Sequence, residues 1–165
     1  MTTADLAPLA ERVAAPADVP VPADIDGLTW RPLTRNDVPA LTRLLNAVEE
    51  WSQGRSMFAP RWSFVAVDDG TGEVAGYLLS GRYEHDWPVI GYKAGYTDLL
   101  GVRRAWRGRR LARALLATVM AAYQADGMDY AELGVDTANQ SGAHRLYEGL
   151  GYAVFHSSTL FSIEL

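Results

Sequence analysis

The strongest pattern in the chain is a helical repeat of apolar residues between positions 111 and 123. Apolar residues recur there every three or four positions, which places them on one helix face: Leu111, Leu115, Leu116, Val119, Met120 and Tyr123. Gly127 follows and is a typical helix stop. A second stripe follows Thr34 and Asp37, whose spacing signals a helix start, and comprises Val38, Leu41, Leu44, Leu45 and Val48. A third, short helix is predicted over Asn139–Glu148.

Short runs of strand-forming residues separate these helices. They predict strands over Leu28–Leu33, Ser63–Val67, Val74–Leu79, Tyr96–Val102, Tyr130–Val135, Tyr152–Phe155 and Leu160–Leu165. Segment 68–72, Asp-Asp-Gly-Thr-Gly, has the composition of a hairpin turn. The predicted order is β-α-β-β-β-α-β-α-β-β, which indicates a mixed sheet with helices packed on it.

The first 27 residues differ from the rest of the chain. They contain seven alanines and four prolines, which predicts an acidic, partly disordered N-terminal extension with a short helix near Asp5–Ala14. Residues 28–165 have the length of one domain. The longest nearly apolar run, Ala114–Tyr123, is too short to cross a bilayer, which takes about 20 residues. No secretory signal is recognisable, so we expect a cytoplasmic protein with no membrane partner.

The charge and the cysteine content limit the kinds of site and ligand that the chain can have. The chain has no cysteine, which excludes disulfide scaffolds, zinc–thiolate sites and a cysteine nucleophile. The three histidines show no metal-ligand spacing, so no metal is expected. The net charge is −5, yet six arginines lie within eleven positions: Arg103, Arg104, Arg107, Arg109, Arg110 and Arg113. One dense cationic spot on a mildly acidic chain indicates a small anionic ligand, because nucleic-acid binders spread basic charge over a face.

The arginines lie where a predicted strand turns into the longest predicted helix. The first amides of a helix lack partners within it and carry the positive end of its dipole, so they bind phosphate readily. Gly108 lets the backbone approach a ligand closely, and arginines add forked donors for phosphate oxygens. The alternative is a solvated basic helix start. The turn is not a Walker loop, because no Gly-Lys-Ser/Thr follows.

Two sequence blocks resemble the GNAT superfamily of acyl-CoA-dependent N-acyltransferases. The first is V-R-R-A-W-R-G-R-R-L-A at 102–112, and the second is N-Q-S-G-A-H-R-L-Y-E-G-L-G-Y at 139–152. The family's pyrophosphate loop reads R/Q-x-x-G-x-G/A, and Arg107, Arg110 and Ala112 occupy its defined positions. Arg110 therefore stands where glycine is usual, and it either supplies charge or blocks the site. The order of elements fits over 28–165, and the specific motifs lie within 96–152.

The resemblance implies an α+β fold with a mostly antiparallel sheet, helices on both faces, and acetyl-CoA as co-substrate. Main-chain groups of Leu100, Gly101 and Val102 would pair with the pantetheine arm. Asn139 would contact the pantetheine or the nucleotide, or it would cap a helix. The pyrophosphate would be held by Arg107, Gly108, Arg109, Arg110, Leu111, Ala112 and Arg113.

The family's chemistry requires a polarised thioester, an acid and a base. A main-chain amide near Leu100 would stabilise the thioester oxygen, and Gly101 is compatible with a strand irregularity there. Tyr147 occupies the family's position for the acid that protonates the departing thiolate; the alternative is a packed core tyrosine. The first candidate for the base is Asp98, and the connecting loop supplies Glu84, His85 and Asp86.

Three functions stay open from the sequence. The first is transfer of an acetyl or short acyl group to a primary amine of a small molecule or peptide, in an acceptor pocket lined by Trp51–Trp62 and Tyr83–Tyr96. The second is an inactive acyl-CoA-binding regulatory module of the same fold. The third is a nucleic-acid-binding domain, against which the acidic isoelectric point of about 5.1 argues. The enzyme is expected to be a monomer or homodimer.

Overall fold

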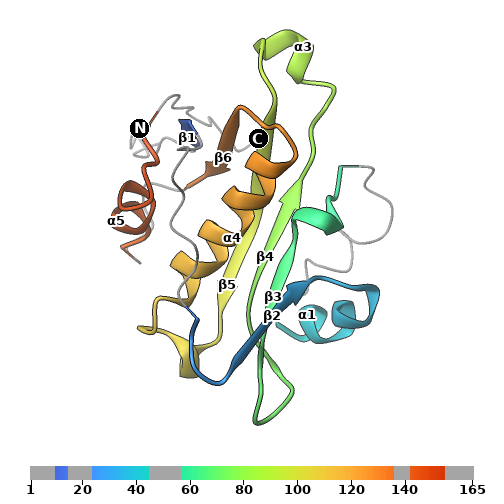
Figure 1. Ribbon diagram of the computed structural model, residues 1–165, viewed down its shortest axis with the longest axis vertical. Helices are drawn as coiled ribbons and strands as arrows, with labels where there is room; N and C mark the ends of the chain where they lie inside the picture. The colour runs from blue at the N-terminus through green and yellow to red at the C-terminus, as the bar shows by residue number, and fades with distance from the viewer. Residues whose placement is uncertain (1–9, 15–23, 45–56, 136–141, 155–165) are drawn as a thin grey trace, which may run out of the picture.

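The computed structural model describes residues 10–14, 24–44, 57–135 and 142–154, which form one six-stranded sheet with helices on both faces (Figure 1). The strand order is β1-β6-β5-β4-β3-β2. The strands are β1 Ala10–Ala14, β2 Leu28–Pro32, β3 Phe64–Asp68, β4 Val74–Gly81, β5 Ala94–Val102 and β6 Tyr130–Gly134. Among the six described strands, β5 and β6 pair in parallel, and the other neighbours are antiparallel. The mixed, mostly antiparallel sheet predicted from the sequence is therefore confirmed.

The helices differ widely in length. The longest is α4, Leu111–Ala125, which crosses in front of the sheet in Figure 1. The short helix α3, Trp87–Ile90, extends beyond the end of the sheet within the connection between β4 and β5. The other helical elements are α1 Val38–Leu44, α5 Ala143–Glu148 and the 3-10 turns Arg35–Asp37, Pro60–Trp62 and Arg104–Trp106. No helix in the described ranges is long and apolar enough to span a membrane.

Alternation along the central strands builds two apolar clusters, one on each face of the sheet. Ala66 of β3 and Leu78 of β4 belong to the larger cluster, which includes the apolar stripe of α4. Their neighbours Val65 and Leu79 belong to the smaller cluster, together with Leu41 of α1. Successive strand residues point to opposite faces, so both predicted amphipathic helices cover apolar faces of one sheet.

The sequence and the structure differ at the N-terminal end. The predicted helix near Asp5–Ala14 is wrong over Ala10–Ala14, because these residues form β1 and pair antiparallel with β6. Helix propensity is a weak local preference even for alanine, the strongest helix former, whereas the outer edge of β6 offers a row of hydrogen-bonding partners to an extended chain. Long-range pairing therefore overrides the local preference.

Two other predicted elements are shorter in the structure. The helix predicted from Asn139 begins at Ala143, after Gly142 in the left-handed region at φ 75°. Of the predicted strand Tyr152–Phe155, the described part contains a single bridge residue, Ala153. The strand predicted over Leu160–Leu165 lies outside the described residues.

The arrangement of β5 creates the opening that the site uses. This strand pairs with β6 only over Ala94–Thr97, whereas it pairs with β4 from Tyr96 to Val102. Within the described part of the chain, the end of β5 beyond Thr97 therefore has a neighbouring strand on one side only. Its other edge presents main-chain donors and acceptors next to the start of α4.

Candidate active site

A cavity of about 700 Å³ lies at the N-terminal end of α4. Arg107, Arg110 and Arg113 contribute three guanidinium groups to its wall, beside Gly108 and Ala112. Arg110 is the residue that precedes α4, and its side chain forms no capping hydrogen bond. The first amides of α4 thus remain available within a strongly cationic cavity, which is a suitable environment for a diphosphate.

The turn into α4 contains two residues with positive φ. Gly108 has φ 77° and Arg110 has φ 62°. A left-handed conformation costs a non-glycine residue roughly 1–2 kcal/mol, which explains why a glycine suits the position that Arg110 occupies. The turn nevertheless opens onto a cavity that Arg110 helps to line, so this arginine does not fill the space beside α4.

The other residues predicted to hold the pyrophosphate lie partly in the core and partly at the surface. Leu111 is 2% exposed and packs in the larger cluster, so only its main chain can reach a ligand. Arg109 stacks its guanidinium 4.6 Å from the centre of the Trp106 ring. Nε of Arg107 donates to the carbonyl of Val102 at 3.3 Å, which ties the turn to the end of β5.

The strand irregularity predicted at Gly101 lies instead at Asp98. Gly101 pairs in register with Tyr77, whose ring occupies the space that a Cβ at Gly101 would need. Further along, Leu79 faces Leu99 but Ser80 faces Thr97, so Asp98 is an extra residue in β5. A bulge of this kind redirects a side chain, and here it redirects a carboxylate.

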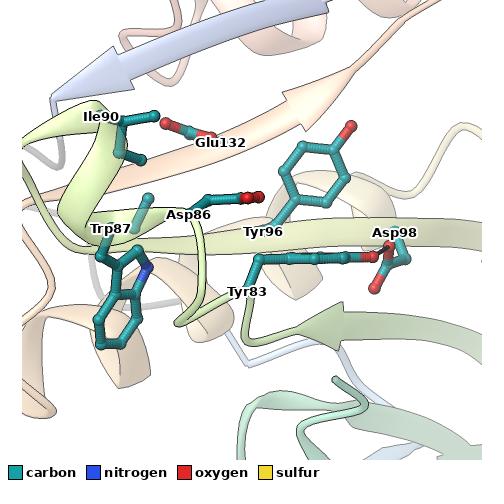
Figure 2. Close-up of a pocket in the computed structure, with 8 residues that line it drawn as sticks. Tyr83, Asp86, Trp87, Ile90, Tyr96, Asp98 and Glu132 are labelled. Atoms are coloured by element: carbon teal, nitrogen blue, oxygen red, sulfur yellow. Dashed lines mark hydrogen bonds between the residues drawn. The ribbon is translucent and has the colours of Figure 1, made fainter. Parts of the chain in front are cut away.

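Asp98 is held by a tyrosine from the preceding connection. Oη of Tyr83 donates a hydrogen bond to Oδ1 of Asp98 at 2.6 Å (Figure 2). A Cβ at Gly81 would overlap both the Tyr83 ring and Oδ2 of Asp98. The glycine at the end of β4 is therefore what lets these two side chains meet, a role that strand spacing alone does not signal.

Asp98 and Tyr83 line a second cavity of about 400 Å³. Its described lining residues are Tyr83, Asp86, Trp87, Ile90, Ala94, Tyr96, Asp98 and Glu132. The rings of Tyr83 and Tyr96 meet edge to face, with centroids 5.5 Å apart. Burial, and then the charges of Asp98 and Glu132, raise the pKa of Tyr96 above its ordinary value. Tyr96 is therefore a neutral phenol at neutral pH.

The other predicted bases lie outside or at the edge of this cavity. Glu84 is exposed, forms an ion pair with Arg82 and is not among the described lining residues. Asp86 lines the cavity, and Nε2 of His85 lies 3.2 Å from its Oδ1. Of the predicted aromatic wall Trp51–Trp62, residues 51–56 lie outside the described ranges. Trp62 is fully buried and donates to Asp126 at 2.5 Å, so it serves the core.

Glu132 is a lining residue that the sequence analysis missed. It lies on β6 opposite Tyr96 in the parallel β5–β6 pair, between the buried residues Ala131 and Leu133. Ala131 and Leu133 pack on the α4 side of the sheet. Because successive strand residues point to opposite faces, the sequence alone indicates that Glu132 points to the other face. The partner across the sheet was not predictable, because α4 separates the two strands in the chain.

Tyr147 lies on α5 and packs against the larger apolar cluster. Its ring centroid is 5.8 Å from that of Tyr152, which is 3% exposed and whose pKa burial raises above its ordinary value. Tyr147 is not among the described residues that line either cavity. Asn139, the remaining predicted ligand residue, lies outside the described part of the chain.

Comparisons with known proteins agree on one family. Residues 49–152, more than half of the chain, match the model described as the acetyltransferase (GNAT) family. A mycothiol acetyltransferase from Thermobifida fusca is 30% identical over 105 residues, which cover 63% of this chain and 32% of that protein. A mycothiol acetyltransferase from Nocardiopsis dassonvillei is 28% identical over 72% of this chain and 34% of its own. The chain thus spans about a third of the length of these curated relatives.

Solved structures show the same fold. A GCN5-related N-acetyltransferase from Sphaerobacter thermophilus superposes with a TM-score of 0.72 at 27% identity, covering 92% of this chain and 50% of that chain. A ribosomal-protein-alanine N-acetyltransferase from Brucella melitensis biovar Abortus superposes with a TM-score of 0.65 at 22% identity, covering 82% of this chain and 99% of that chain. At 22% identity, the similarity to this second structure is a similarity of fold.

Proposed function

The chain belongs to the acetyltransferase (GNAT) family, and from this premise we propose that it transfers an acetyl or short acyl group from acyl-CoA to a primary amine. The observation that carries the proposal is that β5 borders two cavities of opposite charge. Val102 lines the cationic cavity beside α4, and Asp98 lines the acidic one. A strand edge that has no neighbouring strand among the described residues, between a phosphate site and a carboxylate, suits direct transfer between two bound substrates.

The cationic cavity holds the CoA moiety in this proposal. The amides at the start of α4, with Arg107, Arg110 and Arg113, bind the diphosphate. The edge of β5 that faces away from β4 over Leu100–Val102 pairs with the amides of the pantetheine arm as an added strand. The residues present fit this ligand, since the cavity wall combines three guanidinium groups with an accessible helix terminus.

The acceptor amine must lose a proton before it can attack. An alkylammonium with a pKa of about 10 is neutral in roughly one molecule per thousand at pH 7, which costs about 4 kcal/mol. We assign the proton to Asp98 rather than to Glu84, because Asp98 lines the cavity whereas Glu84 is exposed and paired with Arg82. Tyr83, which donates to Asp98, stabilises the ionised carboxylate that this step requires.

Acyl transfer then exchanges one bond for another. The amine nitrogen forms a bond to the thioester carbon and releases its second proton to water, the carbon–sulfur bond breaks, and the thiolate leaves. A main-chain amide near Leu100 stabilises the charge that develops on the thioester oxygen. Tyr147 supplies the proton to the departing thiolate, as its position in the second sequence block implies. A phenol with a pKa near 10 is suited to this transfer.

The proposal is tested by CoA binding and thiol release. Calorimetry with CoA measures whether the cationic cavity binds the cofactor, and thiol release from acetyl-CoA is measured over a panel of primary amines. In Tyr147→Phe we expect kcat to fall at least tenfold while CoA affinity stays unchanged. A wild-type protein that binds no CoA contradicts the proposal. CoA binding without thiol release for any amine, unaffected by Tyr147→Phe, favours a regulatory acyl-CoA-binding module instead.

A further inference from the structure

Three buried hydroxyl groups meet next to the bulge at Asp98, on the side of the sheet that α4 crosses (Figure 1). Ser80 of β4 and Thr97 of β5 face each other in the β4–β5 pair, and Tyr123 of α4 contacts both of them. Ser80 and Tyr123 are fully buried, and Thr97 is 6% exposed. The proposed function uses none of these groups. Leaving such deeply buried polar groups unpaired costs free energy, so their hydrogen bonds constrain the strands that carry them.

The hydroxyl groups form one chain of hydrogen bonds. Oη of Tyr123 donates to Oγ of Ser80 at 2.7 Å, and Oγ of Ser80 donates to the main-chain carbonyl of Trp62 at 2.7 Å. Because a phenol has a single proton to donate, the contact at 3.4 Å between Oη of Tyr123 and Oγ1 of Thr97 has Thr97 as its donor. The chain therefore begins at Thr97, beside Asp98, and ends at a main-chain oxygen.

Ser80 and Tyr123 are each held by further contacts. The main-chain N–H of Ser80 donates to Oγ of Ser63 at 3.0 Å, and its carbonyl accepts from the N–H of Ala59 at 2.9 Å. The Tyr123 ring lies against β5 where Gly95 has no side chain, since a Cβ at Gly95 would overlap this ring. Ser80 and Tyr123 thus form a fixed point beside the bulge.

The position of the extra residue in β5 depends on this fixed point. Among the described strands, Thr97 is the last residue of β5 with a partner on each side, Ser80 of β4 and Leu133 of β6. A slip by one residue turns every side chain to the opposite face of a sheet. Such a slip would turn Asp98 away from the acceptor cavity and would take the Thr97 hydroxyl away from Tyr123. The hydrogen bonds therefore favour the register in which Asp98 lines the cavity.

We infer that Tyr123 is a positioning residue for Asp98, because it holds Ser80 and Thr97 in the register that places the Asp98 carboxylate in the acceptor cavity. This inference rests on the proposed function, in which Asp98 takes the proton of the acceptor amine. Burial, with a smaller contribution from the charge of Asp98, raises the pKa of Tyr123 far above its ordinary value. Tyr123 is therefore a neutral phenol at neutral pH, and its effect on the reaction is geometric.

Tyr123→Phe and Thr97→Val each remove one hydroxyl of the chain and keep the shape of the side chain. Kinetics use the primary amine that releases thiol fastest in the panel described above. We expect each variant to lower kcat/KM for this amine at least tenfold, because misplacing a catalytic group by about 1 Å costs up to about 100-fold. The KM for acetyl-CoA should change less than twofold, since the first turn of α4 is unaltered.

The matched control is Thr118→Val, which removes a hydroxyl from the same helix, where it donates to the carbonyl of Ala114 at 2.9 Å. This control should leave kcat/KM within twofold of the wild type. Wild-type kcat/KM in both Tyr123→Phe and Thr97→Val overturns the inference.

A double-mutant cycle shows whether the effect of Tyr123 acts through Asp98. Asp98→Asn removes the proposed base, so adding Tyr123→Phe in that background should change kcat/KM less than twofold. An equal loss in both backgrounds means that Tyr123 supports general packing, and it overturns the inference. Wild-type activity of Asp98→Asn contradicts the assignment of the base, and the inference with it.

A carboxyl titration measures the placement of Asp98 without a substrate. Nuclear magnetic resonance follows protein that is isotope-labelled at the aspartate carboxyl carbons, and the Asp98 signal is the one missing from Asp98→Asn. Tyr83 donates to Asp98 at 2.6 Å, and this bond favours the ionised carboxylate only while the two groups stay aligned. We expect the Asp98 midpoint to move to higher pH in Tyr123→Phe and Thr97→Val, and to stay in place in Thr118→Val.

The other ionisable groups around the cavity are the same in all of these proteins: Tyr83, Asp86, Tyr96 and Glu132, with Arg12 opposite Glu132 in the β1–β6 pair. A midpoint that is unchanged in both Tyr123→Phe and Thr97→Val overturns the inference. Failure of every amine to release thiol contradicts the proposed function itself, and the titration then still decides whether Tyr123 holds Asp98 in place.

Discussion

Tyr83 holds the carboxylate that we propose accepts the proton of the substrate. Replacing Tyr83 by phenylalanine removes the O–H group that donates to Asp98 at 2.6 Å and keeps the ring that packs on Tyr96. Because a donated hydrogen bond favours the ionised form of a carboxylate, Asp98 takes up its proton at a higher pH in this variant. We expect the acidic limb of the kcat/KM profile to move to higher pH, so that kcat/KM falls below that of the wild type at the acidic end of the profile.

Thiol-release rates measured from about pH 5 to about pH 9 give the profile. Tyr92→Phe is a suitable control, because Tyr92 packs on Tyr130 with ring centroids 4.9 Å apart and does not line the described cavity. The control should leave the profile in place. A Tyr83→Phe profile that coincides with the wild-type curve contradicts the proposed positioning role.

Arg110 combines an unfavourable backbone conformation with a favourable charge. Glycine adopts φ 62° without the steric cost that arginine bears there. We expect Arg110→Gly to raise the free energy of unfolding by about 1 kcal/mol and to weaken CoA binding about tenfold, since one guanidinium leaves the cavity. Thermal denaturation and calorimetry measure the two effects on the same protein.

Arg110→Lys separates charge from conformation at this position. Lysine keeps the positive charge and the cost of the left-handed backbone, so stability should stay near that of the wild type and CoA affinity should fall less than in Arg110→Gly. Tighter CoA binding by Arg110→Gly would mean that the arginine obstructs the cavity.

At the start of α1, an ion pair and a capping interaction share one buried carboxylate. Asp37 is 5% exposed, and it accepts hydrogen bonds from both terminal nitrogens of Arg31 at 2.6 Å and from the main-chain N–H and side chain of Thr34 at 2.8 Å. Burial acts to raise the pKa of Asp37, but the bonds from Arg31 and Thr34 outweigh it and hold the pKa below its ordinary value of 3.8.

A lowered pKa in the folded state means that Asp37 stabilises the fold above its unfolded pKa and loses this contribution as pH falls through the folded value. We expect Asp37→Asn to cost about 1–2 kcal/mol of unfolding free energy at pH 7. The difference between variant and wild type should shrink below about pH 4. Urea denaturation at neutral and acidic pH measures it, and a difference independent of pH would show that the charge of Asp37 contributes nothing.

Among the elements, those with a strong local signal were predictable from the sequence. The apolar stripe and the stop at Gly127 predict the helix α4. The predicted end at Gly127 lies two residues beyond the observed end at Ala125. The capping spacing of Thr34 and Asp37 likewise marked the start of the first helical segment. The strand β1 and the bulge at Asp98 were not predictable, because each depends on a neighbouring strand that is distant in the chain.

For the whole molecule, the family and the α+β architecture followed from two sequence blocks, and both are confirmed. The cationic cavity formed where the arginine-rich turn predicted it, since strand, turn and helix are contiguous in sequence. The acceptor cavity was predictable only in part. Tyr83, Tyr96 and Asp98 come from one stretch of chain, whereas Glu132 joins them through the parallel β5–β6 pair.

The charge of the cationic cavity leads to a prediction for the whole enzyme. Raising the salt concentration from about 0.1 M to about 1 M shortens the screening length from about 10 Å to about 3 Å. Because anionic CoA faces the arginines of the cationic cavity, the KM for acetyl-CoA should rise several-fold. Initial rates with the acetyl-CoA concentration varied measure this change. A KM for acetyl-CoA that stays constant across this range would mean that hydrogen bonds and packing, and not the field of Arg107, Arg110 and Arg113, hold CoA in the cationic cavity.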